Sequence, residues 1–161
     1  SQEERALAEA KIAALEQQLA EAEAKEQRAK SLAEQTRRGH VYVISNVGSF
    51  GENVYKIGMT RRLDPMDRVR ELGDASVPFS FDVHAIIFAD DAPALETALH
   101  REFSQHRVNA VNLRKEFFNV ELASIRSAVQ QIGGEDVDFK TTIAAEEYFE
   151  SKRLREQFVT A

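Results

Sequence analysis

Hydrophobic positions near the start of the chain recur at the spacing of a helix. Residues 3–38 contain no glycine or proline and are rich in alanine and glutamate. The strongest apolar positions in this stretch are Ile12, Leu15, Leu19 and Ala22. Their alternating steps of three and four are those of a coiled-coil seam. We therefore predict one long helix over residues 1–38 that pairs with a second copy of the chain, the alternative being a single solvated helix.

From residue 39 the pattern changes to that of β-strands. Residues 40–45 and 54–59 are rich in β-branched and aromatic residues, and the stretch between them is rich in Gly, Ser and Asn. This arrangement predicts a β-hairpin with a long connection. Residues 79–89 first alternate between apolar and polar side chains and are then almost wholly apolar, which is typical of a strand buried on both faces. Residues 116–120 are compatible with a short edge strand.

Helices are predicted between and after these strands. Asp64 and Pro65 are a good N-cap and first-turn residue for a helix that ends at Gly73. A second helix begins near Asp91, and a third over residues 121–132 stops at Gly133 and Gly134. Residues 142–161 predict an amphipathic helix that docks on the domain or on a partner.

These elements divide the chain into three parts. They are a long helix over 1–38, a globular domain over 39–134, and a linker with an amphipathic helix over 135–161. A globular part of about 95 residues is long enough for one core and too short for two. We expect an α/β fold, with a mostly antiparallel three-stranded sheet flanked by helices.

Composition limits the classes of function. The chain has 161 residues and a formal net charge of −6, so it is not a polybasic nucleic-acid coat and any nucleic-acid site must be local. The absence of cysteine excludes thiolate metal sites and cysteine nucleophiles, which leaves His, Asp and Glu as strong metal ligands.

No apolar run approaches the roughly 20 residues of a membrane-spanning helix. We expect no membrane segment in this piece of chain and a cytoplasmic location. Because the chain begins at Ser1 within helical sequence, we also expect an upstream part, which could carry other domains or an anchor.

Cations and tyrosines are concentrated in the predicted hairpin and the helix after it. These residues are Tyr42, Tyr55, Lys56, Arg61, Arg62, Arg68 and Arg70. Between Lys56 and Arg70 only Asp64 and Asp67 are acidic, so this is a local basic patch of the kind that an anion or phosphate site requires. The alternative is a solvated charged face, and it applies most to Arg61, Arg62 and Arg70.

One carboxylate lies in an unusual position. Glu96 is flanked by Leu95 and Leu99 on a largely apolar helix, where it must be paired, metal-bound or at the edge of a cleft. His100 follows four residues later and shares its helical face. The pair suits metal coordination, although an ordinary hydrogen-bonded pair is the simpler explanation.

Five short motifs follow one another between Gly39 and Val120. They are residues 41–46, residues 54–60, residues 67–72, Glu96 with Leu99 and His100, and residues 116–118. In order and spacing they resemble the GIY-YIG nuclease superfamily. More narrowly, they resemble the branch named after a meiotically up-regulated gene and a phage open reading frame. That branch is often described simply as DNA-binding.

The resemblance implies a role for each matching residue. Tyr42 is a candidate general base, although a tyrosine with a pKa near 10 needs help at neutral pH. Lys56 stands where the superfamily usually has tyrosine, and it could stabilise a phenolate or contact the scissile phosphate. Arg68 would bind the phosphate, and Glu96 would hold a divalent metal ion, Mg²⁺ or Mn²⁺. His100 would be a leaving-group acid or a supporting group.

We further expect Tyr55, Arg61, Arg62 and Arg70 to contact nucleic acid. His40 replaces the glycine of the first motif, which raises the question of whether its side chain obstructs the substrate. The resemblance implies a metal-dependent DNA endonuclease and, by analogy, restriction of phage or other foreign DNA in bacterial defence. The alternatives are a catalytically silent DNA-binding module and a coiled-coil element for oligomerisation or partner binding.

Overall fold

The computed structural model describes residues 1–133, 137–141 and 143–160. The chain divides into two units, Ser1–Thr36 and Arg37–Ala161, which are considered separately. Helix α1, Gln2–Arg37, is continuous, so the long helix is confirmed. Ile12, Leu15 and Leu19 are each more than half exposed along α1. The apolar seam is therefore uncovered in one chain, and its pairing with a second copy stays a prediction.

The second unit is built on an antiparallel sheet with the strand order β3-β1-β2-β4. Its strands are β1 (Gly39–Ser45), β2 (Val54–Thr60), β3 (Asp82–Ala89) and β4 (Phe117–Asn119). The hairpin is confirmed, with a short helix α2, Val47–Phe50, in its connection. The expected three-stranded sheet is wrong by one strand, because β4 pairs with the first half of β2.

The second half of β2 has no neighbouring strand on its outer side among the described residues. Pairing with β4 ends at Lys56, opposite Phe117. Beyond that point the backbone of β2 bonds to other groups: the Ile57 amide donates to the Glu116 carbonyl at 3.2 Å. We call this second half, residues 57–60, the open edge of β2.

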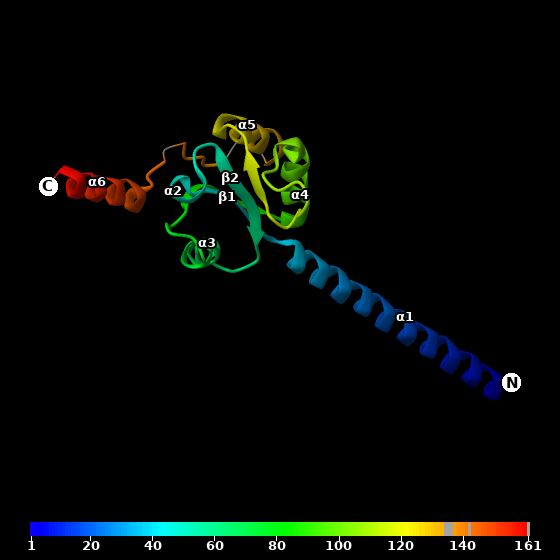
Figure 1. Cartoon of the computed structure of the whole chain (residues 1–161). Helices are drawn as coiled ribbons and strands as arrows, with labels where there is room; N and C mark the ends of the chain where they lie inside the picture. The colour runs from blue at the N-terminus through cyan, green and yellow to red at the C-terminus, as the bar shows by residue number, and fades with distance from the viewer. Residues whose placement is uncertain (134–136, 142, 161) are drawn as a thin grey trace. The chain divides into compact units, whose positions relative to one another are not determined.

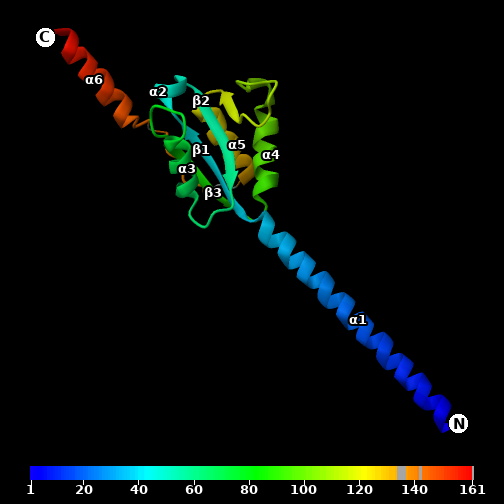
Figure 2. The same ribbon diagram turned by 60° about the horizontal axis from the view of Figure 1, so that its bottom comes forward.

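Helices cover both faces of the sheet, as Figures 1 and 2 show. Helix α3 (Pro65–Asp74) lies on one face, and α4 (Ala92–Glu102) and α5 (Leu122–Gly133) lie on the other. The predicted cap at Asp64 is confirmed, since Asp64 accepts from the Met66 amide at 3.0 Å. The helix predicted to begin near Asp91 is also confirmed, and Asp91 caps it by accepting from the Ala94 amide at 3.1 Å. A 3₁₀ turn, Ser104–His106, follows α4.

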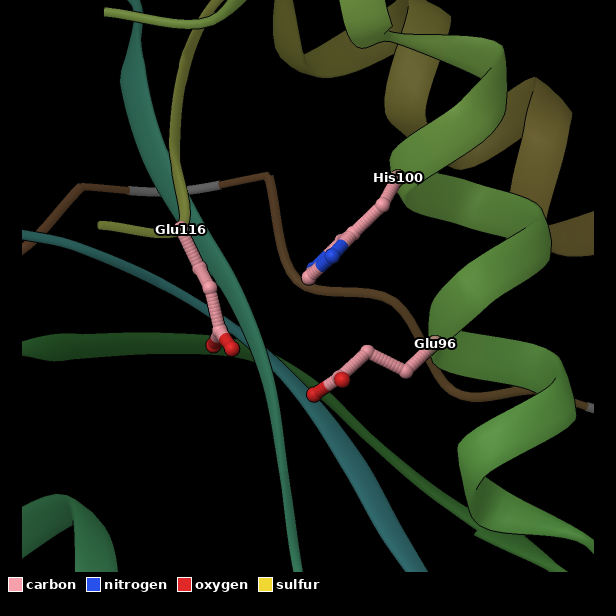
Figure 3. Close-up of side chains that lie close together, drawn as sticks. All are labelled: Glu96, His100 and Glu116. Carbon is pink, nitrogen blue, oxygen red and sulfur yellow. The ribbon is translucent and has the colours of Figure 1, made fainter. Parts of the chain in front are cut away.

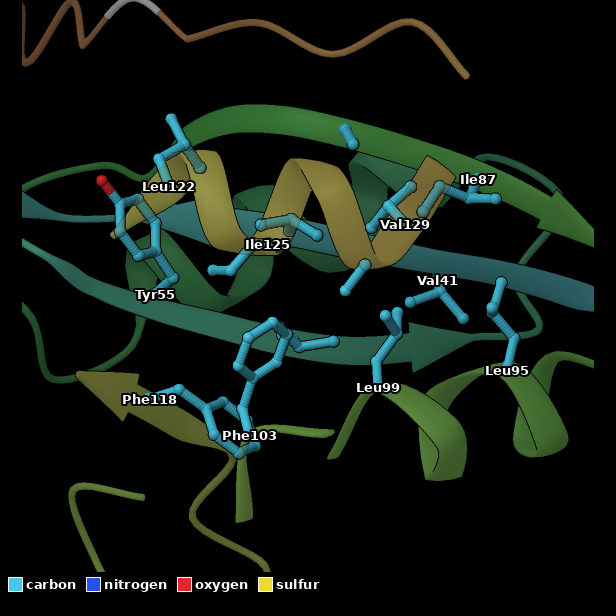
Figure 4. Close-up of a cluster of buried hydrophobic side chains, with 14 of the residues drawn as sticks. Val41, Tyr55, Ile87, Leu95, Leu99, Phe103, Phe118, Leu122, Ile125 and Val129 are labelled. Atoms are coloured by element: carbon cyan, nitrogen blue, oxygen red, sulfur yellow. The ribbon is translucent and has the colours of Figure 1, made fainter. Parts of the chain in front are cut away.

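The main core lies between the sheet and the helices α4 and α5 (Figure 4). Alternate residues of β1 and β2 supply the sheet side, and Leu99, Ile125 and Val129 supply part of the helical side. A smaller cluster on the α3 face is formed by Tyr42, Ile44 and Val69. This alternation directs Tyr42 and Lys56 to the α3 face and Tyr55 to the main core.

The strand β3 begins at Asp82 rather than at Phe79, and it is an edge strand whose Phe88 is 62% exposed, so it is not buried on both faces throughout. The C-terminal helix α6 spans Glu146–Thr160, and Tyr148 in its first turn packs against Phe79 with ring centroids 5.5 Å apart.

The predicted domain boundary after residue 134 lies outside the described residues, as do the predicted ends of the last helix at Thr142 and Ala161. Among the helices that are described, none combines the length and the apolar character needed to cross a bilayer.

Candidate functional site

Side chains from five parts of the chain meet beside the open edge of β2. Tyr42 is the first of them, and it comes from β1 directly opposite Gly58 of β2. Because Gly58 has no side chain, the Tyr42 ring lies against its backbone, with Oη among the atoms nearest to Gly58. Tyr42 is 2% exposed, so the protein fixes the position of its phenol.

Arg68 reaches the same phenol from α3. It donates a hydrogen bond to Tyr42, and its Nη1 is held 3.1 Å from Glu71 Oε1 one turn further along the helix. Burial, together with the charge of Glu116, raises the pKa of Tyr42 to about 12, while Arg68 opposes the rise. The phenol is therefore protonated at neutral pH.

Glu96 approaches the open edge from α4. Its carboxylate accepts a hydrogen bond from the Met59 amide of β2. Burial, together with the charge of Glu116, raises the pKa of Glu96 to about 7, while Lys56 opposes the rise. Two carboxylates thus lie close enough to disfavour each other's charge.

Glu116 is the site residue that the sequence did not identify. It directly precedes β4, and its carboxylate lies 3.5 Å from Lys56 Nζ. Ligand atoms of Glu96, His100 and Glu116 all lie within 4.8 Å of one another, and Figure 3 shows the two carboxylates directed toward a common point. Glu116 begins the fifth sequence motif, but only the pairing of β4 with β2 brings it to the site.

Lys56 is the cation nearest to this carboxylate pair. Its side chain is 12% exposed, with Nζ 5.3 Å from the centroid of the Phe117 ring. Burial lowers the pKa of Lys56 and the nearby Arg68 lowers it further, while Glu116 opposes the shift. The site therefore holds two cations and two carboxylates near one buried phenol.

His100 is tied to the backbone of β2. Its Nε2–H donates to the Ile57 carbonyl over 2.6 Å, and burial lowers its pKa, so the imidazole is neutral at pH 7. Since Nε2 is engaged in this bond, the two carboxylates are the stronger candidates for metal ligands, and His100 is a neighbour that supports the edge of the strand.

Tyr55 is a correction to the expected nucleic-acid contacts. It is 2% exposed within the main core (Figure 4). Its ring meets the His84 ring edge-on at 5.5 Å. It alternates with Lys56 along β2 and so faces away from the site. A side chain buried in this way does not reach a nucleic acid.

The remaining expected contacts lie on or before α3 and carry little uncompensated charge. Arg62 is paired with Glu71, and Arg70 lies 2.9 Å from Asp67 and 3.7 Å from Asp64. Arg61 is exposed. His40, which takes the place of a motif glycine, packs its ring edge-on against Phe88 of β3 at 5.5 Å, on the side away from β2.

The donor set fits a divalent cation. Oxygen ligands from two carboxylates suit Mg²⁺ or Mn²⁺. The charge of Glu116 helps to raise the pKa of Glu96 although Lys56 opposes the rise, so the pair lacks positive charge when both carboxylates are ionised. A cation between Glu96 and Glu116 would supply the missing positive charge.

Residues 39–133 match the T5orf172 domain, and the chain belongs to this family. The family supports the coarser part of the resemblance, a DNA-binding or endonuclease-like module related to the GIY-YIG superfamily. In comparisons with curated proteins and with solved structures, nothing matched the chain.

Proposed function

We propose that this protein is a metal-dependent endonuclease that hydrolyses phosphodiester bonds of DNA. The observation that carries the proposal is the convergence of Arg68, Lys56 and Tyr42 on the carboxylates Glu96 and Glu116. A module that only bound DNA would gain nothing from two half-buried carboxylates beside its phosphate-binding cations, since they repel phosphate.

Arg68 and Lys56 would bind the scissile phosphate. The guanidinium of Arg68 is held by Glu71 and directed at the site, so it can form two parallel hydrogen bonds to phosphate oxygens. Lys56, whose ammonium lies 3.5 Å from Glu116, adds a compact positive charge. Both cations would also stabilise the negative charge that grows on the phosphoryl oxygens in the transition state.

Glu96 and Glu116 would hold Mg²⁺ or Mn²⁺, with water and phosphate oxygens completing its shell. Such an ion, when bound, activates water and polarises the phosphate. The Met59 amide orients Glu96 by donating to it, and the Lys56 ammonium orients Glu116. His100 supports the strand edge between them.

Tyr42 would position the attacking water. With a pKa of about 12 the phenol donates a hydrogen bond and does not remove a proton at neutral pH. Because Glu96 and Glu116 are among the causes that raise this pKa, a cation bound between them would lower it. The role of general base that the family resemblance implies for Tyr42 is therefore limited to the metal-loaded site.

The wider proposals follow from the same family resemblance. A nuclease of this branch behind a long helix suits restriction of phage or other foreign DNA in the bacterial cytoplasm. The exposed seam of Ile12, Leu15 and Leu19 suits pairing of two chains, which would place two active sites on one assembly. Reduced phage plating by cells that express the protein, lost with Glu96→Gln, tests the defence role.

Nicking of supercoiled plasmid tests the nuclease itself. The wild-type chain is incubated at low salt with Mg²⁺, with Mn²⁺ and with a chelator, beside Tyr42→Phe and Arg68→Lys. We expect metal-dependent nicking that falls by about 100-fold in Arg68→Lys, because an ammonium cannot replace the guanidinium fork. Folded wild-type protein that retains DNA without cutting it under any of these conditions would favour the silent DNA-binding module.

A further inference from the structure

The cations on or near α3 do not provide a basic surface for a long nucleic acid. Between Arg61 and Asp74 the four arginines are matched by four acidic residues, and Arg62, Arg68 and Arg70 each lie within ion-pair distance of one of them. This region can hold one phosphate through Arg68. The strand on either side of that phosphate therefore needs a second binding surface.

A hollow of about 560 Å³ leads away from the carboxylates on the other side of the site. It lies between the second half of α4 and the segment from residue 104 to 116, and Glu96, His100 and Glu116 line it where it meets the site. Further along, its lining includes Arg101, Arg107 and Arg114. We call this hollow the arginine groove.

Apart from Glu96 and Glu116, where the arginine groove meets the site, no acidic residue lines it. From Thr97 to Lys115 the only acidic residue is Glu102, against three arginines and Lys115. Within the described part of the chain, no carboxylate lies within 4.0 Å of the Arg101, Arg107 or Arg114 guanidinium groups. Local positive charge in an acidic protein attracts an anion of matching shape.

The wall of the groove is held in place by its own contacts. Arg107 donates to the Leu113 carbonyl over 3.2 Å, and its guanidinium lies 5.0 Å from the centroid of the buried Phe118 ring. The Asn109 side chain accepts from the Val111 amide at 3.0 Å and from the Asn112 amide at 2.8 Å, which fixes the turn that carries Arg114. The cations are thus presented on a structured surface.

We propose that the arginine groove binds the backbone phosphates of the DNA strand on one side of the scissile bond. This inference rests on the proposed function in taking DNA as the substrate, and it assigns the binding surface to Arg101, Arg107 and Arg114 in place of the cations around α3. The strand would run from the carboxylates along the groove. Since these contacts are to phosphates, they would bind DNA regardless of sequence.

The test is the salt dependence of binding to a fluorescently labelled DNA duplex, measured by anisotropy in chelator so that no cleavage occurs. Arg101→Gln, Arg114→Gln and their combination are compared with the wild-type chain and with Arg126→Gln, an exposed arginine on α5 that serves as the matched control. Each lost phosphate contact should reduce the slope of log K against log salt by about 0.9. The magnitude of this slope should therefore fall by about 1.8 in the double variant and should not change in Arg126→Gln.

Arg107 packs on the core, so its replacement by glutamine could disturb folding. Arg107→Lys keeps the charge, and we expect it to retain the wild-type slope. Unchanged affinity and slope in folded Arg101→Gln/Arg114→Gln would overturn the inference.

Parallel nicking assays separate this inference from the proposed function. Slopes that fall as expected in a protein that never cuts DNA would uphold the groove and overturn the nuclease. Metal-dependent cutting with unchanged slopes would uphold the nuclease and overturn the assignment of the groove. Absence of duplex binding by the wild-type chain at low salt would overturn both.

Discussion

The phenol of Tyr42 occupies the space that a side chain at Gly58 would need. A Cβ added to Gly58 would lie 2.5 Å from Tyr42 Oη and 2.6 Å from Cζ, well inside contact distance. The two residues are direct partners across β1 and β2, so neither can move without disturbing the sheet. Glycine at this position therefore fixes where the phenol meets Arg68 and the carboxylates.

Gly58→Ala should displace the phenol and reduce DNA cleavage by at least about 10-fold, with a loss of stability of about 1–3 kcal/mol from overpacking. Urea unfolding and plasmid nicking measure the two effects. Gly133→Ala, where the added carbon meets neighbours only at ordinary distances of 3.9 Å or more, should leave activity unchanged.

A double-mutant cycle gives the sharper control for Gly58. In a Tyr42→Ala background the clash partner is absent, so Gly58→Ala should cost little further stability. An equal loss of stability in both backgrounds would show that the Tyr42 ring does not occupy the space beside Gly58.

Metal binding should be visible without DNA. Mg²⁺ or Mn²⁺ at ten times its dissociation constant should stabilise the domain by about 1.4 kcal/mol, which corresponds to a rise of roughly 6–11 °C in melting temperature. Glu96→Gln and Glu116→Gln should each remove this rise, whereas Glu102→Gln, an exposed carboxylate on the same helix, should keep it. A rise that survives in both site variants would place the ion elsewhere.

Local signals in the sequence were enough to predict most of the fold. Neighbouring residues determine the cap at Asp64, the helix start near Asp91, the uninterrupted first helix and the two hairpin strands, and each is confirmed. The fourth strand was missed in the sheet count because a strand of three residues has almost no pattern of its own. Its pairing with β2 depends on the whole fold.

Only those site residues that belong to a recognisable sequence motif could be predicted from the sequence. Tyr42, Arg68 and Glu96 follow from motif order, and their convergence follows from the fold. Glu116 is brought to Lys56 by strand pairing between segments some 60 residues apart, and the sequence alone does not determine that pairing. Tyr55 was misassigned because alternation along β2 turns it into the core, on the face opposite to Lys56.

A buried histidine makes the stability of the domain depend on pH. The neutral ring of His84 donates from Nδ1 to the Lys140 carbonyl at 2.7 Å, and the Ser45 hydroxyl donates to Nε2 at 2.7 Å. Burial lowers the pKa of His84, against smaller opposing effects of the Lys140 bond and the charge of Asp82. The native state therefore releases the proton that the unfolded state, with a pKa near 6.5, still binds.

The contribution of neutral His84 to the free energy of unfolding should be complete above pH 6.5. It should decline as the pH falls from there toward the lowered pKa of His84 in the native state. Urea unfolding at pH 8 and at pH 5 measures it. The stability advantage of the wild type over His84→Gln should be larger at pH 8 than at pH 5, while the exposed His106→Gln should track the wild type. An advantage that stays constant across this range would contradict the assignment.

The exposed seam on α1 predicts the oligomeric state. Ile12→Glu with Leu19→Glu should halve the mass measured by light scattering, because charges in a coiled-coil seam prevent pairing. Leu32→Glu is the matched control, since Leu32 is 63% exposed on the same helix but lies outside the spacing of the seam. A wild-type chain that is monomeric at high concentration would leave α1 as a single solvated helix.

The most direct test of the account is plasmid nicking by the two carboxylate variants, Glu96→Gln and Glu116→Gln, beside the wild type and Glu102→Gln. We predict that the wild type and Glu102→Gln nick DNA with Mg²⁺ or Mn²⁺ and stop with chelator. Both site variants should lose about 100-fold or more in rate while remaining folded and bound to DNA. Wild-type rates in both variants would contradict a nuclease centre built on these two residues.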